Sequence, residues 1–184
     1  MIIAMGSVAK RLGLASTITG GAVLLALSAC VFSHELGAQG ASAAPPSGTV
    51  LFICEHGTVK SLLAKVLFEE YAKEVGLKME ARSRGTNLEP MVPPWMHKAL
   101  AADGISVGTW LPQALTPVDL REATYVVSFD IPRALSAPAL APRAQWDGLP
   151  SVSQDYSAGR DAIKAKVRQL VDSLKRVQVR RQSE

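Results

Sequence analysis

The most informative segment of the chain is Val50-Leu51-Phe52-Ile53-Cys54-Glu55-His56-Gly57-Thr58-Val59-Lys60-Ser61. It opens with an apolar run that is short enough for a strand buried in a sheet. A polar segment with a glycine follows Cys54. From Ser61 the apolar residues recur at the spacing of one helical face: Leu62, Leu63, Val66, Leu67 and Tyr71. The stretch therefore predicts a strand, a tight loop that begins at Cys54, and a helix.

This loop has the features of an anion site. The backbone N–H groups of a tight loop and of the first helical turn can point at one oxyanion. The helix dipole favours a thiolate at Cys54, Lys60 adds a positive charge, and Ser61 can hydrogen-bond to the sulfur or cap the helix. A thiolate inside an anion cradle is what attack on a phosphoryl group requires. The loop alone leaves a second interpretation open, in which Cys54 is a buried and inert cysteine.

Predicted strands and helices alternate along the rest of the chain. Strands are expected at 49–53, 79–83 and 125–129. Helices are expected at 61–76, 93–100, 117–123 with Thr116 as the cap, and from about Ser157 onward. The proline-rich segment 132–142 is expected to be mostly loop. This alternation predicts an α/β domain with a mostly parallel sheet.

The N-terminal residues have the layout of a bacterial export signal. Lys10 and Arg11 precede an apolar stretch at 12–27, and Leu27-Ser28-Ala29-Cys30 is similar to a lipobox, in which the cysteine becomes lipidated. Residues 1–30 are therefore expected to be a signal peptide, with lipidation at Cys30. Ordinary cleavage near Ala41-Ser42-Ala43 and an uncleaved membrane anchor are the alternatives. All three place the rest of the chain outside the cytoplasm, in the periplasm or cell envelope.

A flexible linker is expected at 31–48, where Ala, Gly, Ser and Pro dominate. The composition of the chain excludes several classes of protein. Two Cys among 184 residues exclude a disulfide-rich scaffold, and the three His lie too far apart to match a metal-ligand spacing. Without 1–43 there remain 18 basic and 15 acidic residues, with neither a Lys/Arg run nor a set of stacking aromatics. No metal, cofactor or nucleic acid is expected, and membrane contact is expected only through the signal or a lipid.

The wider pattern resembles the low-molecular-weight protein tyrosine phosphatase family, which includes a class of arsenate reductases. The family has Cys, five residues, Arg, and Ser or Thr, where this chain has Cys54, five residues, Lys60 and Ser61. Ala81-Arg82-Ser83-Arg84-Gly85-Thr86 stands where the family has Ser-Ala-Gly-Thr, and Trp146-Asp147 precedes the last helix. The resemblance runs over 49–175. It implies one three-layer α/β domain with a mostly parallel four-stranded sheet over 49–176, followed by a basic tail at 177–184.

The resemblance implies a phosphatase of the cysteine-nucleophile type. Its substrate would be a phosphate monoester, on a small molecule or a protein, and Cys54 would form the phosphoenzyme. Ser61 would support the thiolate. The phosphate would be held by the loop residues, which are Glu55, His56, Gly57, Thr58, Val59, Lys60 and Ser61.

Lys60 is the first departure from the family pattern. The family's Arg grips phosphate through a planar fork of two donors, whereas a lysine is a point charge. The change should weaken stabilisation of the transferring phosphoryl group. It favours an alternative function, in which the domain binds an anion or a partner without turnover.

The second departure concerns the general acid. The family carries an Asp-Pro pair before the last helix, and Ser151-Val152 holds that place here. Asp147 and Asp155 lie on either side and are the candidate acids, although a turn position for Asp147 and a helix cap for Asp155 are the simpler interpretations. Asp130 is a further candidate, because it ends a strand on the side where α/β ligands bind.

A thiol redox role, similar to that of the arsenate reductases, is the third possibility. Arsenate reduction of the thioredoxin-linked kind requires further cysteines to take over the oxidised nucleophile. Export processing would leave Cys54 as the one cysteine able to act, since Cys30 would be removed or lipidated. An internal disulfide relay is therefore excluded, and a relay through an outside thiol remains open.

Overall fold

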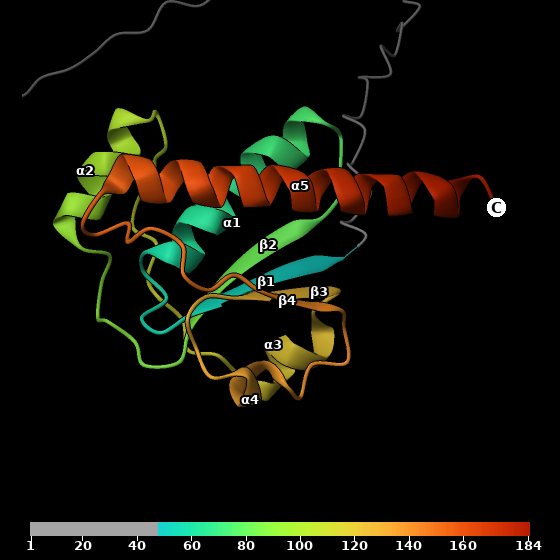
Figure 1. Cartoon of the computed structure of the whole chain (residues 1–184), viewed down its shortest axis with the longest axis horizontal. Helices are drawn as coiled ribbons and strands as arrows, with labels where there is room; N and C mark the ends of the chain where they lie inside the picture. Colours follow the sequence, from blue (N-terminus) through green and yellow to red (C-terminus); the bar gives the residue numbers. More distant parts are fainter. Residues whose placement is uncertain (1–47) are drawn as a thin grey trace, which may run out of the picture. The chain divides into compact units, whose positions relative to one another are not determined.

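A four-stranded parallel sheet forms the centre of the domain (Figure 1). The computed structural model describes residues 48–184, so the predicted export signal, the lipidation at Cys30 and nearly all of the predicted linker lie outside the described residues. The strand order is β2-β1-β3-β4, and every pairing is parallel. The strands are β1 (Thr49–Cys54), β2 (Glu80–Gly85), β3 (Tyr125–Ser128) and β4 (Arg143–Gln145). The predicted α/β class with a four-stranded sheet is confirmed.

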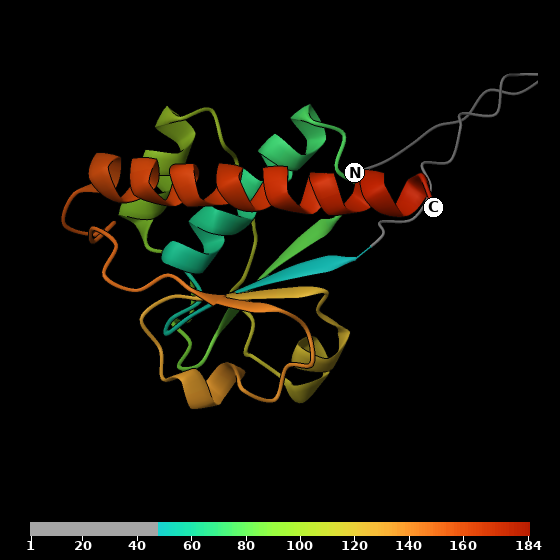
Figure 2. The ribbon, with the colours of Figure 1, turned by 45° about the vertical axis from the view of Figure 1, so that its right-hand side comes forward.

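Helices cover both faces of the sheet, which makes three layers (Figure 2). On one face lie α1 (Lys60–Glu74), α2 (Pro94–Ala102) and α5 (Tyr156–Gln182), and on the other lie the short α3 (Pro117–Glu122) and α4 (Arg133–Ser136). None of the helices in residues 48–184 is long and apolar enough to cross a membrane.

Two apolar cores follow from the alternation of side chains along β1. Val50 and Phe52 face the layer of α1 and α5, whereas Leu51 and Ile53 face the layer of α3. All four side chains are fully buried. A strand enclosed on both faces reads as a continuous apolar run, which is why β1 was recognisable in the sequence.

The order in which the chain adds strands to the sheet reverses at β1. From β1 the chain moves to β2 on one side, and it returns to β3 on the other side of β1. Ligands of open α/β sheets bind at the carboxyl ends of the strands that flank such a reversal. Here those ends are Cys54 of β1 and the segment that follows Ser128 of β3.

Several boundaries differ from the sequence-based expectations. The segment 132–142 is mostly loop, as expected, but it contains the four-residue helix α4, and β4 begins at Arg143, directly after the segment. The segment 177–184, predicted as a basic tail, is helical through Gln182. Arg and Gln are good helix formers, so α5 continues beyond its last buried residue, Val171, without apolar burial to mark its extent.

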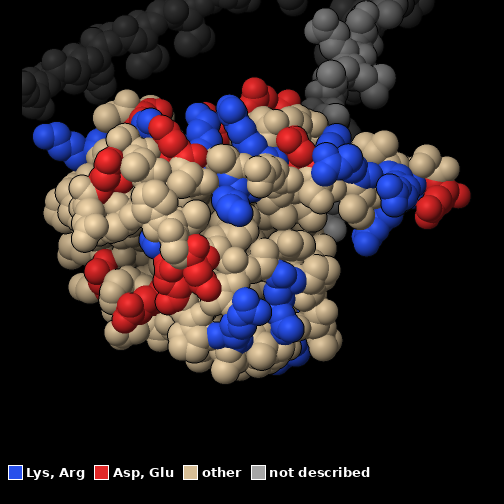
Figure 3. Space-filling model, in the orientation of Figure 1, with Lys and Arg blue, Asp and Glu red and all other residues tan. Residues whose placement is uncertain are grey.

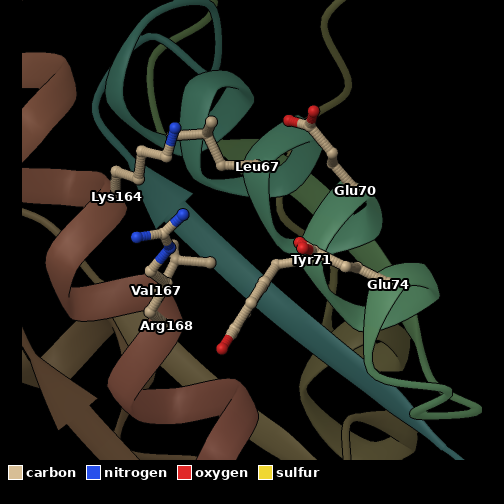
Figure 4. A pocket seen from close by; sticks show the side chains of 7 residues that line it. All are labelled: Leu67, Glu70, Tyr71, Glu74, Lys164, Val167 and Arg168. Carbon is tan, nitrogen blue, oxygen red and sulfur yellow. The ribbon is translucent and has the colours of Figure 1, made fainter.

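The contact between α1 and α5 leaves only a small hollow (Figure 4). Its volume is about 50 Å³, which suits a water molecule rather than a substrate. The Tyr71 hydroxyl donates to Asp172 at 3.2 Å, and the Arg168 guanidinium lies 5.4 Å from the centre of the Tyr71 ring. This hollow lies within the packing contact between two helices and is too small for a substrate.

A buried ion pair ties α3 to the sheet. The Asp119 carboxylate accepts from the Arg84 Nε at 2.9 Å, and it closes a capping box with Thr116 at the start of α3. Burial acts to raise the pKa of Asp119, but the hydrogen bonds from Arg84 and Thr116 and the charge of Arg84 lower it overall. Asp119 is 6% exposed, so both partners depend on this contact rather than on water.

Replacing Asp119 by alanine is expected to lower the free energy of unfolding by about 3 kcal/mol, because the largely buried Arg84 loses its carboxylate partner and the helix loses its cap. A depressed carboxyl pKa stabilises the fold fully above about pH 4, and this contribution is lost as the pH falls through the lower folded-state value. Urea titrations from pH 3 to 7 measure both effects. Glu122→Ala breaks an exposed pair with Arg82 and is the control, with an expected change below about 0.5 kcal/mol. Equal losses in the two variants would contradict the assignment.

Candidate active site

Cys54 is the last residue of β1, and its sulfur is held by two polar neighbours. The Cys54 Sγ lies 3.0 Å from the Ser61 Oγ and accepts from the Gly57 amide at 3.2 Å. Cys54 is 7% exposed and Ser61 is fully buried. Donors directed at the sulfur stabilise its ionised form, and α1 begins at Lys60 with its N-terminus toward the same loop. The arrangement suits a thiolate.

A second serine orients the first. The Ser83 Oγ of β2 donates to the Ser61 Oγ at 2.8 Å, and it also lies 3.1 Å from the Gly57 carbonyl oxygen. When Ser83 donates to Ser61, the Ser61 proton is directed at Cys54. The sequence pattern alone assigns no role to Ser83. Only the pairing of the strands gives it one, because Ser83 pairs in register with Phe52 and therefore faces the same side of the sheet as Cys54.

Two glycines allow the loop to pack directly on the end of β2. Gly57 has φ +75°, and a Cβ there would lie 2.9 Å from the Gly85 nitrogen. A Cβ at Gly85 would lie 2.8 Å from the His56 carbonyl carbon. The amide of Thr86 donates to the Glu55 carbonyl at 2.8 Å and fastens the loop there. Only glycine fits at both positions, so the shape of the loop depends on this pair.

A cleft of about 420 Å³ opens beside Cys54. Its walls come from the Cys54 loop, from the connection between β2 and α2, from the segment after β3, and from the segment before α5. The lining residues that matter for chemistry are Cys54, Lys60, Glu89, Trp95, Asp130 and Ser151. The cleft lies at the reversal of chain direction described above, where the topology predicts a ligand.

The Lys60 ammonium is paired with the Asp130 carboxylate. Asp130 follows β3, and it adopts φ 49°, a left-handed conformation that costs about 1 kcal/mol in a residue with a Cβ. Its amide donates to the Asp147 Oδ1 at 2.9 Å, and its Oδ1 accepts from the Gly148 amide at 3.0 Å. Burial acts to raise the pKa of Asp130, but Lys60 and the Gly148 amide lower it overall.

The other two candidate acids are not among the residues that line the cleft. Asp155 caps α5, where its Oδ1 accepts from the Ala158 amide at 3.0 Å and from the Ser157 hydroxyl at 2.8 Å. The bond from Ala158, followed by that from Ser157, lowers the pKa of Asp155. The Asp147 carboxylate accepts from the Asp130 amide and so helps to hold Asp130 in place. Neither Asp147 nor Asp155 lines the cleft, whereas Asp130 does. The structure therefore brings Asp130 to Cys54 and leaves the two preferred candidates in the simpler roles of support and cap.

The residues predicted to hold phosphate divide into two groups. Glu55, His56, Val59 and Lys60 line the cleft, whereas Gly57, Thr58 and Ser61 are buried beneath it. The His56 Nδ1 lies 3.0 Å from the Asn87 carbonyl oxygen. Within residues 48–184, no group of His, Cys, Asp and Glu side chains could hold a metal ion.

Trp95, Trp110 and Tyr156 differ in whether they line the cleft. Trp95, at the start of α2, lines the cleft and is 39% exposed. Trp110 packs on the core, and the Tyr156 hydroxyl donates to Asp103 at 2.6 Å. Of these three residues, Trp95 is the one that lines the cleft.

A model of the family described as low molecular weight phosphotyrosine protein phosphatase matches residues 49–146, more than half of the chain. The chain belongs to this family. The matched residues include the Cys54 loop and all four strands. Family membership supports the predicted class of enzyme, a phosphatase with a cysteine nucleophile.

Solved structures with the same fold include an arsenate reductase and two kinds of phosphatase. A thioredoxin-dependent arsenate reductase of Corynebacterium glutamicum is 25% identical, with TM-score 0.57, over 72% of this chain and 64% of that one, so the chain spans less than two thirds of that reductase. The YwlE arginine phosphatase of Geobacillus stearothermophilus is 20% identical, with TM-score 0.61, over 72% and 96%. A low molecular weight phosphotyrosine phosphatase of Vibrio cholerae O395 is 21% identical, with TM-score 0.59, over 70% and 97%. No curated protein matches the chain.

Replacing Ser83 by alanine is expected to lower kcat/KM for an aryl phosphate about tenfold, because Ser61 loses the donor that directs its proton at Cys54. Ser136→Ala is the control, since Ser136 is also a buried serine but lies away from the cleft. Thermal unfolding of both variants separates loss of stability from loss of catalysis. Equal kcat/KM in the wild type and Ser83→Ala would contradict a positioning role.

Proposed function

We propose that this protein is an exported phosphatase that hydrolyses phosphate monoesters through a phosphoenzyme at Cys54. The observation that carries the proposal is the Cys54 sulfur, held by Ser61 and the Gly57 amide at the mouth of the cleft. Location in the periplasm or cell envelope, with a lipid at Cys30, rests on the N-terminal sequence.

The proposed reaction has two steps. The Cys54 thiolate attacks phosphorus, a sulfur–phosphorus bond forms, and the bond to the leaving oxygen breaks. The loop amides and the Lys60 ammonium stabilise the charge on the transferring phosphoryl oxygens. Water then attacks phosphorus, the sulfur–phosphorus bond breaks, and inorganic phosphate and the thiolate are released.

Asp130 is the proposed proton donor to the leaving oxygen. It is the candidate carboxyl group that lines the cleft with Cys54. Its ion pair with Lys60 keeps it ionised at neutral pH, so it must gain a proton before it can act as an acid. Turnover of substrates with poor leaving groups should accordingly be favoured at acid pH, and aryl phosphates with good leaving groups should depend less on pH.

A second candidate function is anion binding without turnover. It is favoured by the Lys60–Asp130 pair, because Asp130 competes with phosphate for the Lys60 ammonium. It is also favoured by Ser151 and Val152, which stand at the place of the family's Asp-Pro. A thiol redox role would need an outside thiol, because Cys54 is the single free cysteine among residues 48–184. The solved neighbours differ in their described activities, so fold likeness does not choose between these functions.

The decisive experiment traps the intermediate. The purified protein is mixed with an aryl phosphate, quenched in acid within one turnover, and digested for mass spectrometry. A phosphoryl group on Cys54, with a matching burst of the aryl alcohol, supports the phosphatase. Phosphate binding in a thermal shift assay, with neither adduct nor release of aryl alcohol, supports the binding domain. A mixed disulfide at Cys54 in cell-envelope extracts would support the redox role.

A further inference from the structure

The walls of the cleft carry more negative than positive charge. Three carboxylates line it, from Glu55, Glu89 and Asp130, against one ammonium group, from Lys60. Acidic side chains also gather beside the carboxyl ends of the strands in the space-filling view (Figure 3). A cleft for phosphate alone has no use for this excess of negative charge, since like charges repel.

Lys60 does not neutralise the negative charge of the residues that line the cleft. Lys60 is paired with Asp130, which leaves Glu55 and Glu89 without a cationic partner among residues 48–184, apart from the half-exposed His56. The His56 Nε2 lies 3.8 Å from the Glu55 carboxylate. A bound phosphoryl group brings further negative charge into the same cleft. Binding is then most favourable when the rest of the substrate supplies positive charge.

Glu89 is held in place beside the phosphate loop. The buried Thr58 hydroxyl donates to the Glu89 carboxylate at 2.6 Å, which fixes that charge against the loop that would hold phosphate. Trp95 lies on the same wall, six residues along the chain, with 39% of its surface exposed. A carboxylate and a partly exposed indole that line one cleft are side chains that recognise ammonium and guanidinium groups.

We propose that the substrate of this site carries a cationic group beside its phosphoryl group, and that Glu89 and Trp95 bind this group. The inference rests on the proposed function, because it names the class of phosphorylated substrate. The whole domain does not produce the preference, since residues 44–184 carry 18 basic and 15 acidic side chains and repel a basic ligand weakly. The preference arises locally, from the wall of the cleft.

The test uses the full chain with Cys54→Ser, so that binding is measured without turnover. Two phosphotyrosine peptides of equal length are compared, one with lysine and one with glutamate at the two positions on each side. At low salt the basic peptide is expected to bind about tenfold more tightly, a difference that corresponds to about 1.4 kcal/mol. The ratio should shrink in 0.5 M salt, because the interaction is electrostatic.

Variants in the Cys54→Ser background locate the effect. Glu89→Gln keeps an acceptor for Thr58 and removes the charge, so the ratio of the two dissociation constants is expected to fall about threefold. Trp95→Ala should lower the ratio in the same direction. Glu80→Gln makes the same change of charge at the exposed start of β2, the opposite end of that strand from the cleft, and should leave the ratio as it was.

Equal binding of the two peptides, or tighter binding of the acidic one, would overturn the inference. An equal fall of the ratio in Glu89→Gln and Glu80→Gln would also overturn it, because the preference would then belong to the overall charge. Hydrolysis of the same peptides by the unsubstituted protein tests the proposed function separately. Hydrolysis without a basic preference removes only the inference, whereas a basic preference in binding without hydrolysis removes only the phosphatase.

Discussion

Replacing Cys54 by serine is expected to reduce turnover of a small aryl phosphate by at least about 10⁴-fold, the scale seen when a catalytic nucleophile is removed. A serine hydroxyl at this position is a far poorer nucleophile than the Cys54 sulfur, which lies within hydrogen-bond distance of Ser61 and the Gly57 amide. Serine can still bond to both partners, so the loop should keep its shape. The measurement is initial-rate hydrolysis of p-nitrophenyl phosphate from pH 4 to 8.

Phosphate binding serves as the control for this variant. Cys54→Ser should keep the thermal shift that phosphate produces in the wild type, which would show that the cradle survives while the chemistry is lost. Turnover within a factor of about ten of the wild type would contradict a role for Cys54 as the nucleophile. A wild type without any turnover would move the conclusion to the binding domain.

Changing Lys60 is expected to have the second largest effect. Lys60→Ala should lower kcat/KM about 10²-fold, because the transferring phosphoryl oxygens lose the one cationic side chain that lines the cleft apart from any charge on His56. Lys60→Arg should raise kcat/KM above the wild type, because guanidinium offers phosphate two parallel donors. Steady-state kinetics of the three proteins on one aryl phosphate measure both changes.

Lys65→Ala is the matched control, since Lys65 lies five residues further along α1, does not line the cleft, and pairs with Glu69. It should leave kcat/KM unchanged. A loss in Lys60→Ala no greater than in Lys65→Ala would contradict the phosphate-binding role. Activity in Lys60→Arg with none in the wild type would mark the domain as a binding protein that one substitution returns to catalysis.

The strand, loop and helix around Cys54 were predictable because each depends on neighbours in the sequence. An apolar run of strand length, a glycine, and then helical spacing are local signals, and the structure places β1 and α1 where they indicate. The short helix α3 was also recognisable, because Thr116 is a local cap. The brief elements α4 and β4 carry too few residues for a periodic pattern, so they were not separately assigned.

The identity of the acids near Cys54 was not predictable in the same way. Asp147 and Asp155 were preferred for their closeness in sequence to Ser151, where the family has its acid. Asp130 lies beside Lys60 because β3 pairs with β1, a contact between segments 70 residues apart. Ser83 and Glu89 reach the loop for the same kind of reason, from β2 and the segment that follows it.

The sequence by itself determined the α/β class, the thiol at the end of a strand, and the loop and helix that can favour its ionised form. These features arise from propensity, apolar spacing and capping, which act over a few residues. Only the tertiary structure decided which side chains surround that thiol. The order of strands in the sheet places Asp130 against Lys60 and the Glu89–Trp95 wall against the loop, because parallel pairing brings together strand ends that are distant in the chain.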